Sequence, residues 1–477
     1  MPEPAPREQE RISTRAFLRI FTAVMLPLFL GALDQTLLAT ATPAIAAELG
    51  GVRDSTWIAL GYLIAAVIMI PLYGRLGDRY GRGRMLIGAL AVFGVGSAAC
   101  AAAPSMFLLV IARVVQGLGG GGLMVMSQAL IGELVPPRER PRFQGYFAAN
   151  FTLASILGPT LGGLVVSHFS WRWLFIVNVP LALVAAWRIW RQTASVHPSA
   201  APALVDTPGA LLFAAATATT VAWAGLAGHR FAWLSATSGG LLLTAAVLIA
   251  GLIRREITIA APLLPFELLR VSGIAPMAAT VVLFASCFFA CIFFLPIALQ
   301  LGAGHAPSAT GLLLLPITLG MVVGSTLTGR IVARTGRPRP MPIVGLSVSA
   351  VALATIGLAP AQPAMIAFLG ALTGIGFGTV MPTAQVTIQT LAGRRKLGAA
   401  AAVVSLSRSL GAVLGTAFFG ALVYGLLHGM DLDAVLLTGS DSERAAILRA
   451  FQIGFIASAA LAAMGAWCAT RVPGVKL

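Results

Sequence analysis

The chain has 477 residues, of which 58% are hydrophobic and only 10% are charged, and its mean hydropathy is +0.90. A water-soluble domain of this composition would expose large apolar patches, so the composition predicts an all-helical protein that crosses a membrane many times. The net charge of +16 does not indicate nucleic-acid binding, because the basic residues form short clusters between apolar runs.

Long apolar runs follow one another along the whole chain. A helix needs about 20 apolar residues to cross the hydrocarbon layer, and each run is read as one such helix. About fourteen runs lie near 17–45, 56–74, 85–103, 106–133, 143–165, 173–190, 207–226, 235–253, 273–300, 308–329, 341–360, 362–390, 398–426 and 448–470. The first run is too long for a signal peptide, so we expect a retained helix behind a cytoplasmic tail, residues 1–16.

Basic residues are unevenly distributed between the segments that join these runs. With a cytoplasmic N-terminus, twenty-five of the 32 Lys and Arg residues fall in cytoplasmic segments and five in external ones. This distribution agrees with the positive-inside rule. An even number of spans also places the C-terminus in the cytoplasm.

Three sequence blocks occur twice, at nearly the same spacing. The segment 74–84 (GRLGDRYGRGR) is matched by 329–337 (GRIVARTGR), 255 positions later. Two glycine blocks repeat in the same order: Gly117, Gly119 and Gly121 match Gly374, Gly376 and Gly378, and Gly158 and Gly162 match Gly411 and Gly415. We therefore expect two six-helix bundles, 17–191 and 273–477, with two inserted helices and their linkers in 192–272. Two such bundles around a site near the midplane are typical of alternating-access transporters.

Four motifs carry a resemblance to a known family. They are Gly74-Arg75-Leu76-Gly77-Asp78-Arg79-Tyr80-Gly81-Arg82, Leu33-Asp34-Gln35-Thr36, Arg113-Val114-Val115-Gln116-Gly117-Leu118-Gly119 and Gly158-Pro159-Thr160-Leu161-Gly162-Gly163. Together they resemble the major facilitator superfamily, and in particular its fourteen-span drug/proton antiporters. The resemblance covers nearly the whole chain. One departure is Ala333, which stands where the repeat would place a counterpart of Asp78.

The resemblance implies roles for two of these motifs. The first motif would form a gating loop that closes the cytoplasmic side, with Gly74, Asp78, Arg79, Gly81 and Arg82 as its main residues. An ordinary positive-inside loop would explain its arginines but not its carboxylate. Gly158, Pro159, Gly162 and Gly163 would form the antiporter motif, although close helix packing alone would also explain these small residues.

Asp34 is the candidate proton-coupling residue. Of the sixteen acidic residues it alone lies well inside a predicted span, and a charge there is costly to keep without a use. Arg113, the basic residue well inside the same bundle, is its expected partner. We expect Asp34 to take up a proton from outside, to loosen its hold on Arg113 or on substrate, and to release the proton inward. A purely structural ion pair is the alternative.

Candidate substrate contacts are harder to identify. Aromatic and methionine side chains could line an adaptable apolar pocket, and Gln116, Phe284, Phe288 and Met381 are the candidates, with interhelical packing as the alternative. Arg408, beside Ser405, Ser407 and Ser409, is expected to snorkel or to bond neighbouring carbonyl groups.

These features predict a proton-coupled antiporter that exports small amphipathic or lipophilic compounds through the inner membrane of a bacterium. The alternatives are a dedicated metabolite or siderophore exporter and, further off, a proton-coupled symporter. The sequence has no phosphate-binding loop, hydrolase motif or metal-ligand spacing, so no enzyme activity, cofactor or metal is expected. The expected partners are the substrate, protons and membrane lipid, and an exporter of this type can also hand its substrate to a periplasmic adaptor protein.

Overall fold

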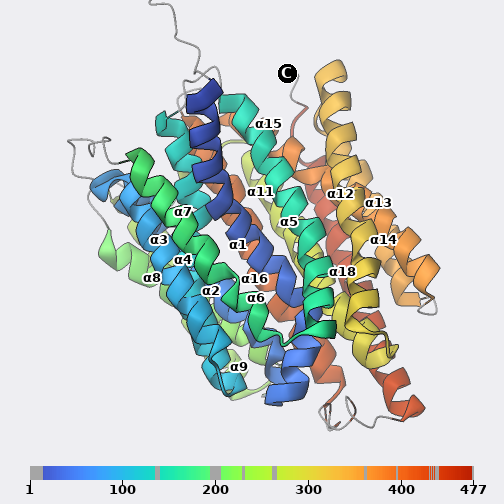
Figure 1. Ribbon diagram of the computed structural model, residues 1–477. Helices are drawn as coiled ribbons and strands as arrows, with labels where there is room; N and C mark the ends of the chain where they lie inside the picture. The colour runs from blue at the N-terminus through green and yellow to red at the C-terminus, as the bar shows by residue number, and fades with distance from the viewer. Residues whose placement is uncertain are drawn as a thin grey trace, which may run out of the picture.

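Nearly every part of the chain that the structure describes is helical (Figure 1). The computed structural model describes residues 14–134, 140–193, 206–227, 231–259, 266–358, 362–393, 396–428, 430, 432, 435 and 440–474. Thirteen helical segments among these residues are long and apolar enough to cross a membrane. The fold is therefore that of a multi-pass membrane protein, as the composition indicates.

In the first half of the chain, the described residues form seven α-helices and one short 3₁₀ turn. They are α1 (Thr14–Leu49), η1 (Val52–Ser55), α2 (Thr56–Tyr80), α3 (Arg82–Ala101), α4 (Met106–Leu134), α5 (Arg140–His168), α6 (Arg172–Ile176) and α7 (Asn178–Thr193). The last two follow one another and together make one candidate span, Arg172–Gln192. In Figure 1, α3, α4 and α7 lie on the left, whereas α1 and α5 run through the middle.

The second half begins with the helices predicted to be an inserted pair and ends with those predicted to form the second bundle. Its elements are α8 (Thr207–Leu226), α9 (Ala236–Thr258), α10 (Phe266–Leu269), α11 (Ile274–Ile297), η2 (Ala298–Gly302), α12 (Pro307–Thr335), α13 (Pro340–Leu358), α14 (Pro363–Gly378), α15 (Val380–Ala392), α16 (Leu397–Leu426) and α18 (Asp441–Thr470). Within it, α14 and α15 together form one candidate span, Pro363–Ala392.

One of the fourteen expected spans, 143–165, has no counterpart among these thirteen segments. It corresponds to α5. This helix has 29 residues, and its described apolar part is the shorter stretch Leu153–His168. The first turns of α1 and the end of α18 lie at the same end of the bundle (Figure 1), which an even number of crossings requires. The count of fourteen and the cytoplasmic position of both termini stay predictions, and residues 1–13 of the expected tail lie outside the described part.

Repeated glycines bring corresponding helices of the two halves into backbone contact. A Cβ atom on Gly162 of α5 would lie 2.3 Å from the carbonyl oxygen of Leu37 in α1, and one on Gly415 of α16 would lie 2.2 Å from the Cα atom of Ser286 in α11. The first glycine blocks behave alike, because Gly117 and Gly121 approach α2 whereas Gly374 and Gly378 approach α12. Each half is thus assembled by the same pair of small-residue contacts.

The two halves touch through the antiporter motif. A Cβ atom on Gly163 would lie 2.6 Å from the carbonyl oxygen of Pro307 in α12, and one on Gly311 would lie 2.5 Å from that of Pro159 in α5. Between α1 and η2, the Gln300 amide donates a 3.1 Å hydrogen bond to the carbonyl oxygen of Thr40. Close backbone packing therefore joins the halves as well as the helices inside each half.

A carboxylate holds the inserted helices together. Asp206 caps the N-terminus of α8, where its Oδ1 accepts from the Gly209 amide at 3.1 Å. The same carboxylate pairs with Arg255 of α9, whose Nη2 lies 2.6 Å from Oδ1. The hydrogen bond from Arg255 holds the pKa of Asp206 below its ordinary value, and the Gly209 amide acts in the same direction. The pair joined in this way packs through α8 against α2 and α16, one helix from each half.

Adding one methyl group at the repeated glycines tests their packing role. Gly162→Ala and Gly415→Ala are each expected to lower the free energy of unfolding by about 1–3 kcal/mol, because the new Cβ atom overlaps backbone of the neighbouring helix. Gly329→Ala is the matched control, since a Cβ atom there meets nothing within 4 Å. Thermal unfolding of the purified protein measures all three, and equal stability of the three variants would contradict this account.

Asp206→Asn isolates the ion pair, because asparagine also caps a helix but carries no charge. A loss of about 0.5–1 kcal/mol is expected at pH 7, since Arg255 is partly exposed. A lowered pKa in the folded state means that the stabilisation is present above the ordinary carboxyl range and is lost as the pH falls through the folded-state pKa. Unfolding curves from pH 7 downward should therefore converge for the two proteins in acid, and a constant difference would argue against the ion pair.

Candidate functional site

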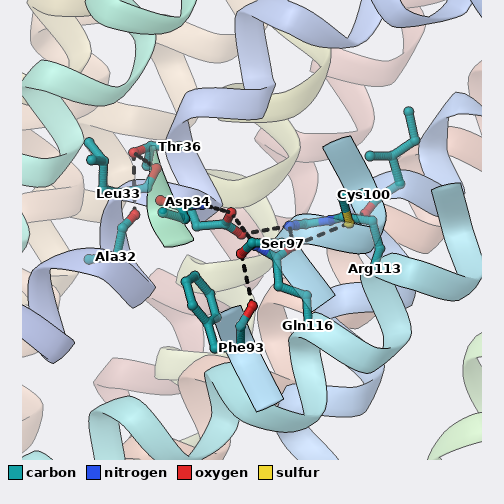
Figure 2. Close-up of polar contacts among 11 residues, drawn as sticks. Ala32, Leu33, Asp34, Thr36, Phe93, Ser97, Cys100, Arg113 and Gln116 are labelled. Atoms are coloured by element: carbon teal, nitrogen blue, oxygen red, sulfur yellow. Dashed lines mark hydrogen bonds and ion pairs between the residues drawn. The ribbon is translucent and has the colours of Figure 1, made fainter. Parts of the chain in front are cut away.

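Polar side chains from four helices meet inside the N-terminal half, and Figure 2 shows those of α1, α3 and α4. Arg113 of α4 donates from Nη1 to Oδ2 of Asp34 in α1 at 2.6 Å. Oδ1 of Asp34 accepts from Nε2 of Gln116 at 2.9 Å and from Nδ2 of Asn178, the first residue of α7, at 3.1 Å. Gln116 also donates to Oγ of Ser97 in α3 at 2.8 Å. The carboxylate therefore receives three donors from two neighbouring helices.

The guanidinium of Arg113 is held on several sides. Its Nε donates to the carbonyl oxygen of Ile58 in α2 at 3.0 Å, and its Nη1 also donates to Oε1 of Gln116. The ring of Tyr62 lies 4.4 Å from its central carbon, and the ring of Phe175 lies 5.9 Å away. Carbonyl, carboxylate and amide oxygens together with aromatic faces are the partners that a buried guanidinium needs.

The network is closed to solvent. Asp34 is 2% exposed and Arg113 is 1% exposed. Gly96 allows α3 to approach α4 this closely, since a Cβ atom on it would lie 2.4 Å from the Cα atom of Gln116. Burying two charges costs several kcal/mol per ion unless further hydrogen bonds compensate. The amides of Gln116 and Asn178 supply such bonds.

The gating motif lies at the junction of α2 and α3. Gly81 separates the two helices and has a φ of 93°, a backbone conformation that favours glycine. Arg82, the first residue of α3, donates from Nη1 to the carbonyl oxygen of Ala129 in α4 at 2.8 Å. Arg79 is exposed near the end of α2, and Gly74 belongs to the same helix. The side chain of Asp78 lies outside the described part, so its role as a gate stays a prediction.

The four candidate substrate contacts come from three helices, α4, α11 and α15. Gln116 belongs to the Asp34 network. Phe284 and Phe288 are buried in α11, where their ring centroids lie 5.6 Å and 6.2 Å from that of Phe377 in α14. Met381 is half-buried in α15. Direct contact of these residues with a substrate stays a prediction.

The sequence indicates the ion pair but not the side chains around it. The sequence pattern does not place Asn178, Ser97 or Tyr62 at this site, although each is a polar residue inside an apolar run. That position is itself a signal, because polar groups in membrane helices face the bundle interior and bond one another. Their spacing along the chain could not show that they meet at Asp34.

Comparison with known proteins agrees with the fold. The family model described as Major Facilitator Superfamily matches residues 24–416. The uncharacterized MFS-type transporter Rv1877 of Mycobacterium tuberculosis is 35% identical over 88% of this chain, which spans only 61% of that protein's length. Multidrug transporter protein MdtP of Bacillus subtilis is 30% identical over 85% of this chain and 75% of its own length. The tetracenomycin C resistance and export protein of Streptomyces glaucescens is 30% identical, over 91% and 82% respectively.

Solved structures share the architecture at low sequence identity. A bacterial homolog of the human lysosomal transporter Spinster, inward-facing and unoccupied, aligns with a TM-score of 0.68 and 15% identity over 96% of this chain and 98% of that one. A D-xylose-proton symporter aligns with a TM-score of 0.66 and 14% identity, with the same coverage. The matched family model, the relatives and the helical bundle together establish that this chain belongs to the Major Facilitator Superfamily of membrane transporters.

Proposed function

We propose that this protein is a proton-coupled antiporter that exports small amphipathic or lipophilic compounds by alternating access, with Asp34 as the proton-coupling residue and Arg113 as its partner. The observation that carries the proposal is the sealed carboxylate–guanidinium pair, with the Gln116 and Asn178 amides around it. The bacterial inner membrane is the proposed location, and hand-over to a periplasmic adaptor stays a prediction.

Protonation of Asp34 would cost a free energy comparable to that needed to shift a conformational equilibrium. A neutral carboxyl group leaves Arg113 as a buried cation without its counter-charge, and breaking a buried pair in this way costs about 3–5 kcal/mol. Shifting a two-state equilibrium from 1:99 to 99:1 takes about 5.5 kcal/mol. The penalty is thus of the size needed to bias one conformation over another, which is what coupling requires.

A chain of contacts leads from Asp34 to the other half of the molecule. Two residues further along α1, Thr36 donates to the carbonyl oxygen of Ala154 in α5 at 3.0 Å. Thr40 donates to the carbonyl oxygen of Pro159 at 3.2 Å, and its own carbonyl accepts from Gln300. A shift of α1 caused by the ion pair would therefore reach both α5 and the second bundle.

The similarity to named exporters supports the export of amphipathic compounds. MdtP carries the name of a multidrug transporter, and the Streptomyces glaucescens relative that of a tetracenomycin C resistance and export protein. A dedicated metabolite exporter is the alternative within the same fold. A broad resistance profile in an overexpressing strain would favour the multidrug function, and resistance to a single compound would favour the alternative.

Asp34→Asn tests proton coupling directly. In everted vesicles with a respiration-driven proton gradient, addition of a transported compound should dissipate the gradient with the wild-type protein, and the rate should fall at least about ten-fold in the variant, because asparagine cannot carry the proton. Lipophilic cations, neutral drugs and weak acids form the panel. Asp206→Asn is the matched control, since it breaks another Asp–Arg pair outside the bundle. Full proton-coupled efflux by Asp34→Asn at normal expression would refute the assignment.

A double variant separates coupling from simple structural pairing. Arg113→Gln leaves Asp34 as a buried charge and should destabilise the protein by about 3–5 kcal/mol. Adding Asp34→Asn removes that charge, so the double variant should regain most of the lost stability in thermal unfolding yet transport without proton coupling. If the pair were only structural, the stable double variant would keep proton-coupled transport.

A further inference from the structure

The second half of the chain has very few carboxylates. The sequence has no Asp or Glu between Glu267 and Asp431, and none after Glu443. Glu267 itself is paired with Lys396, at 3.0 Å. The predicted cytoplasmic segments that follow Glu267 carry the basic residues Arg270, Arg330, Arg334, Arg337, Arg339, Arg394, Arg395, Lys396, Arg471 and Lys476. The positive-inside rule explains these basic residues but not the lack of acidic ones, because Asp and Glu contribute little to orientation. A surface with this charge attracts anions.

Two of these arginines come together where α13 begins and α18 ends. Arg339 directly precedes α13, and its Nη2 donates to the carbonyl oxygen of Thr470, the last residue of α18. That carbonyl belongs to the peptide bond that leads to Arg471. Among the described residues, no carboxylate pairs with Arg339 or Arg471. The junction of α13 and α18 therefore holds two positive charges without a counter-charge.

The Arg339 guanidinium is fixed in position but has few acceptors. Its side chain is half-buried, and its Nε is buried without a hydrogen-bond partner in the part of the chain that the structure describes. A guanidinium has five N–H donors, and the Thr470 carbonyl is a neutral acceptor that leaves the charge uncompensated. Phosphate oxygens are acceptors that match a guanidinium in both charge and geometry.

A tryptophan places this junction at the membrane surface. The central carbon of the Arg471 guanidinium lies 4.7 Å from the ring centroid of Trp467, one helical turn earlier in α18. Trp467 is 56% exposed, although it belongs to a candidate membrane span. Tryptophan at the end of such a span is typical of the headgroup level of a membrane. The anion most readily available at this level is the phosphate of a lipid.

We propose that Arg339 and Arg471 bind the phosphate of an anionic phospholipid, such as phosphatidylglycerol, whose acyl chains lie along Trp467. The lipid supplies the negative charge that the chain itself lacks at this end of the second half. A zwitterionic lipid such as phosphatidylcholine carries its own cation beside the phosphate and binds more weakly there. The bound lipid contacts the start of α13 and the end of α18, two helices that pack against each other.

Fluorescence quenching of Trp467 tests the site in lipid bilayers. The purified full-length protein is reconstituted with phosphatidylglycerol or phosphatidylcholine brominated in the upper acyl chain, each diluted into unbrominated phosphatidylcholine. Subtracting the quenching of Trp467→Phe isolates the signal of Trp467. Half-maximal quenching should need a mole fraction of phosphatidylglycerol at least about five-fold lower than that of phosphatidylcholine, the effect expected of one arginine near an anionic headgroup.

Four variants locate the effect. Arg339→Gln and Arg471→Gln should each reduce the preference for phosphatidylglycerol about three-fold or more, because each removes one charge from the junction. Arg339→Lys keeps the charge and should keep most of the preference. Arg254→Gln is the matched control, since Arg254 is exposed near the end of α9 on the same predicted side of the membrane. It should leave the preference unchanged.

Three results would overturn the proposal. Equal quenching of Trp467 by the two brominated lipids would show that the site has no preference for an anionic headgroup. An equal loss in Arg254→Gln and in Arg339→Gln would show a diffuse surface potential instead of a site. Relief of the quenching by millimolar inorganic phosphate would mean that the junction binds a soluble anion. The test needs no transport, so its outcome is independent of the proposed function.

Discussion

The buried ion pair of Asp34 and Arg113 constrains the N-terminal half, because removing either partner would leave the other as an uncompensated buried charge. Asp34 and Arg113 lie where water cannot solvate them, and the protein replaces that solvation with the Gln116 and Asn178 amides, the Ile58 carbonyl and the ring of Tyr62. With Asp34 charged, both ions of the site have a partner, whereas a neutral Asp34 would leave the buried Arg113 cation without its counter-charge. The proposed coupling uses this difference, since a single proton is small enough to enter a closed bundle yet changes its energy by several kcal/mol.

Glycine packing explains how such a bundle can be rigid inside each half. Backbones approach closely at Gly162 and Gly415, so α1 with α5, and α11 with α16, form tight pairs in which little can move independently. In the proposed mechanism, a change at Asp34 would therefore move whole helices. The two halves hold different charged side chains. The N-terminal half contains the Asp34–Arg113 ion pair, whereas Arg408 of the other half contacts Met124 of the first. The repeat thus gives both halves the same glycine-mediated helix packing, but different charged side chains.

Hydropathy and repeated motifs predicted the membrane fold, because long apolar runs have few alternatives to spanning helices. They also predicted Asp34 and Arg113, since charged residues inside such runs stand out. The hydrogen bonds around this pair could not be predicted from the sequence. Asn178 lies 144 residues from Asp34 along the chain, and no local pattern shows that the two meet. Aromatic content suggested Phe284 and Phe288 as pocket residues, whereas the structure buries both among neighbouring rings in the second bundle. Composition alone cannot distinguish a packed aromatic cluster from a pocket wall.

The most direct measurement of the central claim uses purified protein in liposomes with no imposed proton gradient. A concentration gradient of one compound transported in vesicles is applied alone, and a trapped pH indicator follows the protons. Antiport through Asp34 predicts that protons move opposite to the compound with the wild type and that this movement is absent with Asp34→Asn. Protons that move in the same direction as the compound, or that still move in the variant, would contradict the account.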